Sequence, residues 1–196
     1  MRSEVAVTQP LLVEVPEELG TARLLLRPPR AGDGSMVNEA VVESIESLRP
    51  WMPWADPTPT VEQSEIWCRD GRAAFLARAR LPWIMLERHS GAFVGSAGMP
   101  RLDWKVPRFE IGYWVRRRFE GQGFVTEAVA ALTDLAFGAL AARRVEIRVD
   151  PRNERSWRVP ERLGFVLEGV LRNDERAPDG TLRDTRVYAV TEWGGR

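Results

Sequence analysis

Two glycines, Gly121 and Gly123, stand in the segment of this 196-residue chain with the most definite chemical capacity, IGYWVRRRFEGQGFVTEAVAAL. Glycine has no Cβ atom, so successive backbone N–H groups of such a turn can approach an anion closely. The helix expected to follow adds unpaired N–H groups and the positive end of its dipole. Arg116, Arg117 and Arg118 place positive charge beside the turn. The pattern predicts a diphosphate-binding turn. The alternative is a tightly packed helix entry with solvated arginines.

Two familiar nucleotide-binding motifs do not fit this segment. No Gly-Lys-Ser or Gly-Lys-Thr follows the glycines, which excludes a nucleotide P-loop. A Rossmann motif needs parallel strands and an acidic residue at the end of the next parallel strand, whereas the strands before this turn read as antiparallel. A ligand bound here through its diphosphate would therefore be held by neither a P-loop nor a Rossmann motif.

The other reactive residue types are scarce and exclude several kinds of chemistry. The chain has one cysteine, Cys68, and one histidine, His89, so an internal disulfide, a cysteine cluster and a multi-histidine metal site are excluded. We expect no metal. His89, in LERHSGAF, is interpreted as an exposed turn residue. Lys105 is the only lysine, which leaves one candidate for Schiff-base chemistry.

The elements that must position the glycine turn are strands and helices in mixed order. Alternation and short apolar runs predict strands over 23–28, 82–87, 92–99, 109–115, 145–149, 165–172 and 184–190. The three strands before the turn suit an antiparallel meander. An Asp179-Gly180 pair indicates a hairpin between the last two strands. The fold class expected is mixed α/β (α+β).

Four helices are expected between these strands. Asp33 is a candidate N-cap for a helix to about Glu43, and Thr60 with Gln63 forms a candidate capping box for a helix towards Ala79. Apolar residues at three- and four-residue spacing predict a helix of about 17 residues from 125 onward. A polar helical segment ends near 163–164. Residues 1–20 are interpreted as an N-terminal arm.

At this point the sequence resembles a known family. Arg118-x-x-Gly121-x-Gly123 is similar to the R/Q-x-x-G-x-G/A signature of the GCN5-related N-acetyltransferases (GNAT), whose loop binds the pyrophosphate of acetyl-CoA. TARLLLRP, RPWMPW, EIGYWV, NERS and ERLGFVLEG follow in the order seen in the RimJ/RimL-type ribosomal-protein N-terminal acetyltransferase branch. The resemblance covers most of the chain. It implies one domain over 1–196, with a mostly antiparallel central sheet flanked by helices and splayed between its fourth and fifth strands.

The resemblance also implies acetyl-CoA as the acyl donor and a set of residues that hold it. The backbone of the strand end at 114–116 would pair with the pantetheine and polarise the thioester carbonyl, and Asn153 in NERS matches a residue that bonds the cofactor arm. The implied cofactor-binding residues are Trp114, Val115, Arg116, Arg118, Phe119, Glu120, Gly121, Gln122, Gly123, Phe124 and Asn153.

Transfer of an acyl group from a thioester to an amine needs a base for the amine, hydrogen-bond donors for the carbonyl oxygen and a proton for the thiolate. A single histidine in an expected turn leaves no Ser-His-Asp triad, so direct attack by the amine is favoured over an acyl-enzyme. Cys68 as an acyl carrier has little support, because it lies among helical residues in EIWCRD.

Ser156 in NERS matches the general acid that this branch places near the sulfur. The alternative is a helix N-cap before WRVPERL. Many relatives use a tyrosine as the acid, but Tyr113 and Tyr188 lie outside the matching segment. Pro160 interrupts a segment where relatives continue a helix. We therefore expect a kink or a later helix start, which would move Ser156.

Two glutamates match the family's general bases. Glu110 corresponds to the strand glutamate of histone-type relatives, and Glu175 to the glutamate proposed in the ribosomal-protein branch. The structural alternatives are pairing with a nearby arginine for Glu110 and a solvated loop charge for Glu175. A useful base has its pKa raised by burial, which a sequence does not display. Within this branch we prefer Glu175.

Trp51 and Trp54 lie in the proline-broken stretch RPWMPWADPTPT, which cannot form regular structure. They are candidates for an aromatic wall around the acceptor, which Trp104 could join, or for residues tucked into the core. The acceptor expected is a small-molecule or peptide amine. Succinyl-CoA as donor, with the arginine run serving its carboxylate, and a non-catalytic acyl-CoA sensor stay as alternatives.

Charge and hydropathy argue against nucleic acid and membranes as partners. Twenty-eight basic and 28 acidic residues give no net charge, so counterion release would drive nucleic-acid binding only weakly. No run approaches the ~18 apolar residues of a membrane span, and MRSEVAVTQP lacks the apolar core of a signal peptide. We expect a cytoplasmic protein. The resemblance also allows a homodimer, with the final strand or the N-terminal arm supplying an edge.

Overall fold

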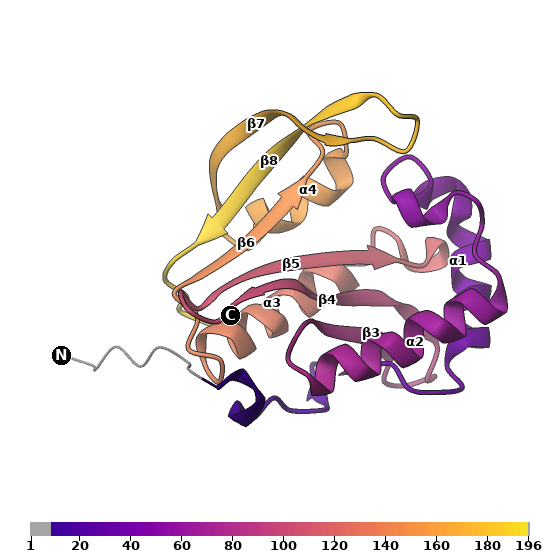
Figure 1. Ribbon diagram of the computed structural model, residues 1–196, viewed down its shortest axis with the longest axis horizontal. Coiled ribbons are helices and arrows are strands. Elements are labelled where there is room, and N and C mark those ends of the chain that lie inside the picture. Colours follow the sequence, from indigo (N-terminus) through magenta and orange to yellow (C-terminus); the bar gives the residue numbers. More distant parts are fainter. Residues whose placement is uncertain (1–8, 196) are drawn as a thin grey trace.

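A computed structural model describes residues 9–195, which form one eight-stranded sheet between helices (Figure 1). The strand order is β1-β2-β3-β4-β5-β6-β8-β7, and within the described residues every neighbouring pair is antiparallel except β5 with β6. The strands are β1 (Leu19–Gly20), β2 (Leu24–Arg27), β3 (Leu81–Glu87), β4 (Phe93–Asp103), β5 (Arg108–Val115), β6 (Arg144–Val149), β7 (Val166–Arg176) and β8 (Leu182–Val190).

The mixed α/β fold class is confirmed, and so is the order of the predicted elements. Part of the expected N-terminal arm, residues 1–8, lies outside the described residues. The rest of it carries a 3₁₀ turn at Pro10–Leu12 and the short strand β1, which pairs with β2 at one edge of the sheet. The final strand β8 lies between β6 and β7, so the expectation that it supplies a free edge is wrong. The free edge on that side is β7.

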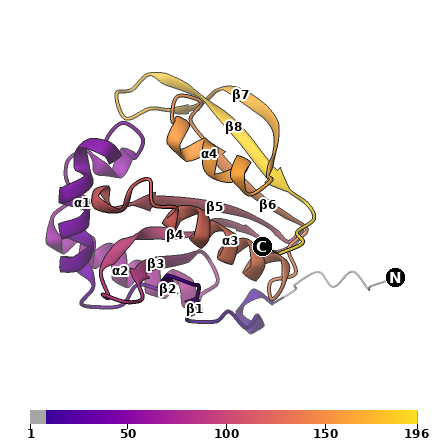
Figure 2. The same cartoon turned by 180° about the vertical axis from the view of Figure 1, so that it is seen from behind.

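The four helices of the described chain cover both faces of the sheet. They are α1 (Gly34–Leu48), α2 (Val61–Leu76), α3 (Phe124–Phe137) and α4 (Glu154–Arg162). Helices α1 and α2 lie on one face, and α3 and α4 lie on the other, as the two opposite views show (Figures 1 and 2). Short 3₁₀ turns occupy Pro53–Ala55 and Arg117–Phe119.

The helix boundaries test the capping predictions. The capping box is confirmed, because Thr60 accepts from the Gln63 N–H and the Gln63 side chain accepts from the Thr60 N–H. Asp33 stands at the N-cap of α1, but its carboxylate bonds to Arg27 and to the Arg30 N–H instead of capping the helix. α1 also continues to Leu48, beyond the predicted end, and α2 ends at Leu76, short of Ala79.

The apolar face of α3 fastens the glycine turn to the sheet. Its predicted stripe is buried, including Ala128, Val129 and Leu132, and it packs in one cluster with Phe109 and Ile111 of β5. Burying a large apolar side chain stabilises a fold by about 1.5–3 kcal/mol. The start of α3 is therefore held in place by the core beneath it.

The sheet opens between β5 and β6. Their parallel pairing joins residues 108–110 only to residues 144–146, and the strands then part (Figure 1). These are the fourth and fifth predicted strands, so the expected splay is confirmed. Beyond Glu110 the β6-facing edge of β5 has no paired strand within the described residues, and a cavity lies there.

Candidate active site

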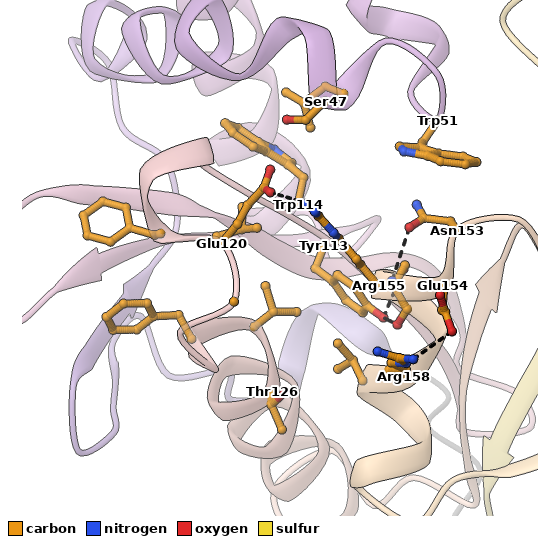
Figure 3. A pocket seen from close by; sticks show the side chains of 18 of the residues that line it. Ser47, Trp51, Tyr113, Trp114, Glu120, Thr126, Asn153, Glu154, Arg155 and Arg158 are labelled. Carbon is orange, nitrogen blue, oxygen red and sulfur yellow. Dashed lines mark hydrogen bonds and ion pairs between the residues drawn. The ribbon is translucent and has the colours of Figure 1, made fainter.

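A cavity of about 930 Å³ lies where β5 and β6 diverge. Its walls come from the end of β5, the glycine turn, the start of α3, the first turns of α4 and the segment after α1. Figure 3 shows Tyr113, Trp114, Glu120 and Asn153 converging on it from these separate elements. The walls from β5, the glycine turn and α3 belong to the segment in which the sequence predicts a diphosphate site, and α4 and the α1 segment add walls from outside it.

The glycine turn presents a run of backbone donors to this cavity. Gly121 (φ +74°) and Gly123 (φ +81°) both adopt left-handed conformations, and Gly123 is the N-cap of α3. Within residues 9–195 the six consecutive N–H groups from Gly121 to Thr126 have no acceptor, since the first helical bond is donated by Glu127 to the Gly123 carbonyl. Exposed N–H groups at a helix start and in successive turn residues form a site for a phosphate anion.

Two of the three arginine side chains beside the turn are bonded to α1. Arg116 is buried and bonds Glu43 of α1 at 2.7 Å, with a further contact to Glu39, and Arg118 bonds Glu43 at 3.0 Å. These bonds, led by that of Arg118, lower the pKa of Glu43 to about 2. The positive charge of Arg116 and Arg118 lies beside the turn, as the sequence predicts, but it is paired with glutamates: these side chains anchor the turn to α1.

Other side chains of the turn hold its shape. Phe119 and Phe124 pack edge to face with centroids 5.6 Å apart, and Gln122 donates to the Arg118 carbonyl at 2.8 Å. Glu120 pairs with Arg155 of α4 at 2.6 Å across the cavity (Figure 3). These residues fix the backbone and leave the contact with the anion to the N–H groups.

Arg23, which the sequence analysis did not identify, also supports the turn. Its guanidinium donates to the Gln122 carbonyl at 2.9 Å and to Glu127 at 2.7 Å, and it lies 4.3 Å from the centre of the Phe124 ring. Arg23 lies in TARLLLRP, but no motif signals its contacts, because they join positions about a hundred residues apart.

The end of β5 offers fewer backbone groups than the resemblance implies. The Arg116 N–H donates to the Val94 carbonyl of β4 at 2.7 Å, so it is not available to a pantetheine. N–H and C=O groups alternate sides along a strand. Since residue 116 faces β4, residue 114 also faces β4 and Val115 faces the splay. The backbone of Val115 is therefore the part of the expected 114–116 segment that can pair with a cofactor.

Asn153, not Ser156, is the N-cap of α4. The Asn153 Oδ1 accepts from the Ser156 N–H at 3.2 Å, so the interpretation of Ser156 as the cap is wrong. α4 begins at Glu154 and includes Pro160, so the expected later start did not occur. Ser156 lies in the first turn of α4, and both Asn153 and Ser156 line the cavity.

Tyr113 approaches Ser156 from the opposite wall. The Tyr113 Oη donates to the Ser156 carbonyl at 2.8 Å, and the Ser156 Oγ lies 3.3 Å from the same Oη. Burial raises the pKa of Tyr113, so its hydroxyl is protonated at neutral pH. The sequence analysis set this tyrosine aside because it lies outside the NERS segment, but the fold brings the two together.

The two candidate bases are neighbours. Arg101 of β4 lies 3.0 Å from Glu110 and 3.9 Å from Glu175, so one guanidinium bridges both carboxylates. Burial raises the pKa of Glu110, which faces the same side of the sheet as Trp114. Glu175 bonds Arg183 at 2.6 Å, and Arg183 also reaches the Trp51 carbonyl. Neither glutamate is among the residues that line the 930 Å³ cavity.

The tryptophans divide between two cavities and the core. Trp51 lines the first cavity, over Asn153 (Figure 3). Trp54 is 44% exposed and packs 6.0 Å from Trp114 at the wall of a second cavity of about 860 Å³ on the α1–α2 face. Trp104 is buried against Phe109, so it joins neither wall.

Two further residues complete the account of reactive groups. Cys68 is buried in α2, and burial raises the pKa of its thiol to about 12, which does not suit a nucleophile. His89 is exposed in the turn between β3 and β4, as predicted. Among residues 9–195 no cluster of three or more His, Cys, Asp or Glu residues could hold a metal ion. No helix of the described chain is long and apolar enough to cross a bilayer.

Comparisons with known proteins agree with this geometry. YdaF of Bacillus subtilis (strain 168), which carries the name of a ribosomal N-acetyltransferase, is 31% identical over 166 residues, 83% of this chain and 89% of its own. The solved structure of Mycobacterium smegmatis RimJ in complex with CoA-disulfide is 29% identical, covers 86% of this chain and 81% of its own, and has a TM-score of 0.77.

The structure of the microcin C7 self-immunity acetyltransferase MccE, in complex with acetyl-CoA and AMP, matches with a TM-score of 0.83 over 92% of this chain and 99% of its own. At 20% identity this match concerns the fold alone. The family model described as an acetyltransferase (GNAT) domain matches residues 23–166, which include the splay, the glycine turn and α4. This chain therefore belongs to the GNAT acetyltransferase family.

Proposed function

We propose that this protein transfers an acetyl group from acetyl-CoA directly to the N-terminal amine of a protein, with residues 1–196 acting as one domain. The observation that carries the proposal is the run of six unpaired N–H groups from Gly121 to Thr126, which opens into a cavity at the splay. These donors match the diphosphate of CoA, and the unpaired edge of β5 suits an extended pantetheine arm.

Direct attack is supported by the absence of a suitable nucleophile within the described residues. Cys68 is buried with a raised pKa, and His89 is exposed in a distant turn. The amine nitrogen bonds to the thioester carbon, the carbon–sulfur bond breaks, and the amine proton passes to a base. The Val115 N–H, at the open edge of β5, is the donor we assign to the carbonyl oxygen.

Ser156 is the proposed general acid for the leaving thiolate. It lines the cavity from the first turn of α4, and Asn153, which caps that helix, fixes its backbone. Of the two candidate bases, Glu110 has better support than Glu175, because burial raises its pKa towards the working pH. Glu175 is bonded to Arg183, so it fits a role in ordering the acceptor side. Neither lines the cavity, so Glu110 acts through a water molecule.

The acceptor is proposed to approach from the α1–α2 face, opposite α4. Trp114 borders both cavities, and Trp54 packs against it on that face. An apolar wall of this kind suits the first side chains of a peptide. Similarity to YdaF supports a ribosomal protein as acceptor and a cytoplasmic location. Succinyl-CoA has less support as donor than acetyl-CoA, because two of the three arginines of the run, Arg116 and Arg118, are already bonded to glutamates.

A thiol-release screen tests the proposed function. Acetyl-CoA and succinyl-CoA are each offered with ribosomal-protein N-terminal peptides, amino acids, aminoglycosides and polyamines. We expect turnover with acetyl-CoA and free N-terminal peptides, and none with the same peptides acetylated beforehand. If acetyl-CoA binds but no amine releases CoA, the chain is an acyl-CoA sensor and the proposal is wrong.

A further inference from the structure

Pro160 leaves an unpaired carbonyl inside α4. In a helix the carbonyl of each residue accepts from the N–H four residues later, and proline has no N–H. The carbonyl affected here is that of Ser156, the proposed acid. Tyr113 of β5 donates to this carbonyl at 2.8 Å, and α4 continues past the proline to Arg162.

Tyr113 reaches Ser156 across the splay. It lies three residues beyond Glu110, the last β5 residue paired with β6, and both Tyr113 and Ser156 line the cavity. The tyrosine has one proton, which it gives to the Ser156 carbonyl. Its oxygen can therefore only accept from the Ser156 Oγ, 3.3 Å away. One hydroxyl thus contacts both the backbone and the side chain of the same serine.

We propose that Tyr113 is a positioning residue that sets the place and the hydroxyl direction of Ser156 in the cavity. The inference rests on the proposed function, because it acts through Ser156 as the general acid. Tyr113 does not give up its own proton: it holds the serine on the β5 side of α4, where the splay receives the thioester. Pro160 is part of this arrangement, since it has no N–H and so leaves the Ser156 carbonyl free to accept from Tyr113.

A double-mutant cycle between Tyr113→Phe and Ser156→Ala tests the inference. We expect Tyr113→Phe to lower kcat by ~3- to 10-fold, the range of one net hydrogen bond, with little change in the KM for acetyl-CoA. In the Ser156→Ala background the same change should have no further effect on kcat. Multiplicative losses, or an unchanged kcat in Tyr113→Phe, would overturn the inference. A wild-type kcat in Ser156→Ala would instead refute the proposed acid.

Tyr188→Phe is the matched control. Tyr188 also bonds α4, but through Glu161 at 2.9 Å, and it does not line the cavity. Its loss should lower the melting temperature without the kcat loss of Tyr113→Phe. Equal kcat losses in the two variants would mean that any loosening of α4 slows the enzyme, and the inference would be wrong.

Pro160→Ala supplies a rescue. The alanine returns an N–H to the helix, four residues after Ser156, so the serine carbonyl regains a donor without the tyrosine. The Tyr113→Phe/Pro160→Ala double variant should recover part of the kcat lost in Tyr113→Phe. No recovery would contradict the role assigned to the carbonyl bond.

Discussion

Neighbouring groups shift the pKa of Glu110 in opposite directions. Burial raises its pKa, and the nearby carboxylates Glu146 and Glu175 act in the same direction. Arg101, 3.0 Å away, lowers it. A base must be deprotonated to accept the amine proton, so activity should rise with pH through the pKa of this group.

Replacement of Arg101 by Gln should move the acidic limb of the kcat/KM profile to higher pH, because it removes the charge that favours the Glu110 carboxylate. Arg69→Gln is a suitable control, since Arg69 pairs with Glu65 on α2, away from both candidate bases. A limb that stays in place in Arg101→Gln would remove Glu110 from the reaction.

Glu110→Gln should lower kcat by ~10²-fold or more and abolish the acidic limb. Glu175→Gln should keep the limb and change the KM for the peptide. The reverse pattern, with the limb lost only in Glu175→Gln, would show that the initial preference for Glu175 is right and that Glu110 is a structural partner of Arg101.

At the scale of elements, Glu43 joins the glycine turn to α1. Its pKa in the folded protein is lowered to about 2 by Arg118 and Arg116, against the ordinary value of 4.5. A lowered pKa means that the ion pairs stabilise the fold fully above pH 4.5 and are lost as the pH falls towards 2.

Wild type should have a lower free energy of unfolding at pH 3 than at pH 6. In Glu43→Gln this decrease should be smaller, because glutamine has no charge that acid can remove. Glu46→Gln is the matched control: Glu46 is exposed on the same helix and pairs with Arg49, three residues later, rather than with the turn. Denaturant unfolding at the two pH values measures this. If both variants lose stability with acid as wild type does, Glu43 is not the anchor of the turn.

Elements with a local cause were predictable, and contacts between distant residues were not. The stripe of α3, the Thr60–Gln63 box and the glycine turn before α3 follow from spacing within a few residues. The continuation of α4 through Pro160 could not be predicted from the sequence, because the carbonyl that the proline frees accepts from Tyr113, 47 positions earlier in the numbering. The bond between Arg116 and Glu43 could not be predicted either, since only the packing of α1 against the turn brings the two side chains together.

At the scale of the whole molecule, β7 is an exposed edge. Val166, Leu167, Val170 and Leu171 are all exposed along it, and unpaired apolar edges favour association with a second chain. We keep the homodimer as a proposal, with β7 as its contact in place of the final strand.

The Leu167→Lys/Val170→Lys variant should shift the mass measured by light scattering from dimer to monomer. Val106→Lys is the control, since Val106 is also an exposed apolar residue but lies in the loop between β4 and β5. A wild-type mass equal to one chain, or an unchanged dimer in the double variant, would exclude β7 as the interface.

The central claim is that bare N–H groups of the glycine turn hold the diphosphate, and calorimetric CoA affinity tests it most directly. Gly121 (φ +74°) and Gly91 (φ +71°) have matching conformations, with open space where a Cβ would lie, but Gly91 is in the β3–β4 turn. Valine at either site should cost about 1–2 kcal/mol of stability. We expect Gly121→Val to weaken CoA binding by ~10-fold or more, about 1.4 kcal/mol, and Gly91→Val to leave it unchanged. Equal CoA affinities in Gly121→Val and wild type would contradict the account.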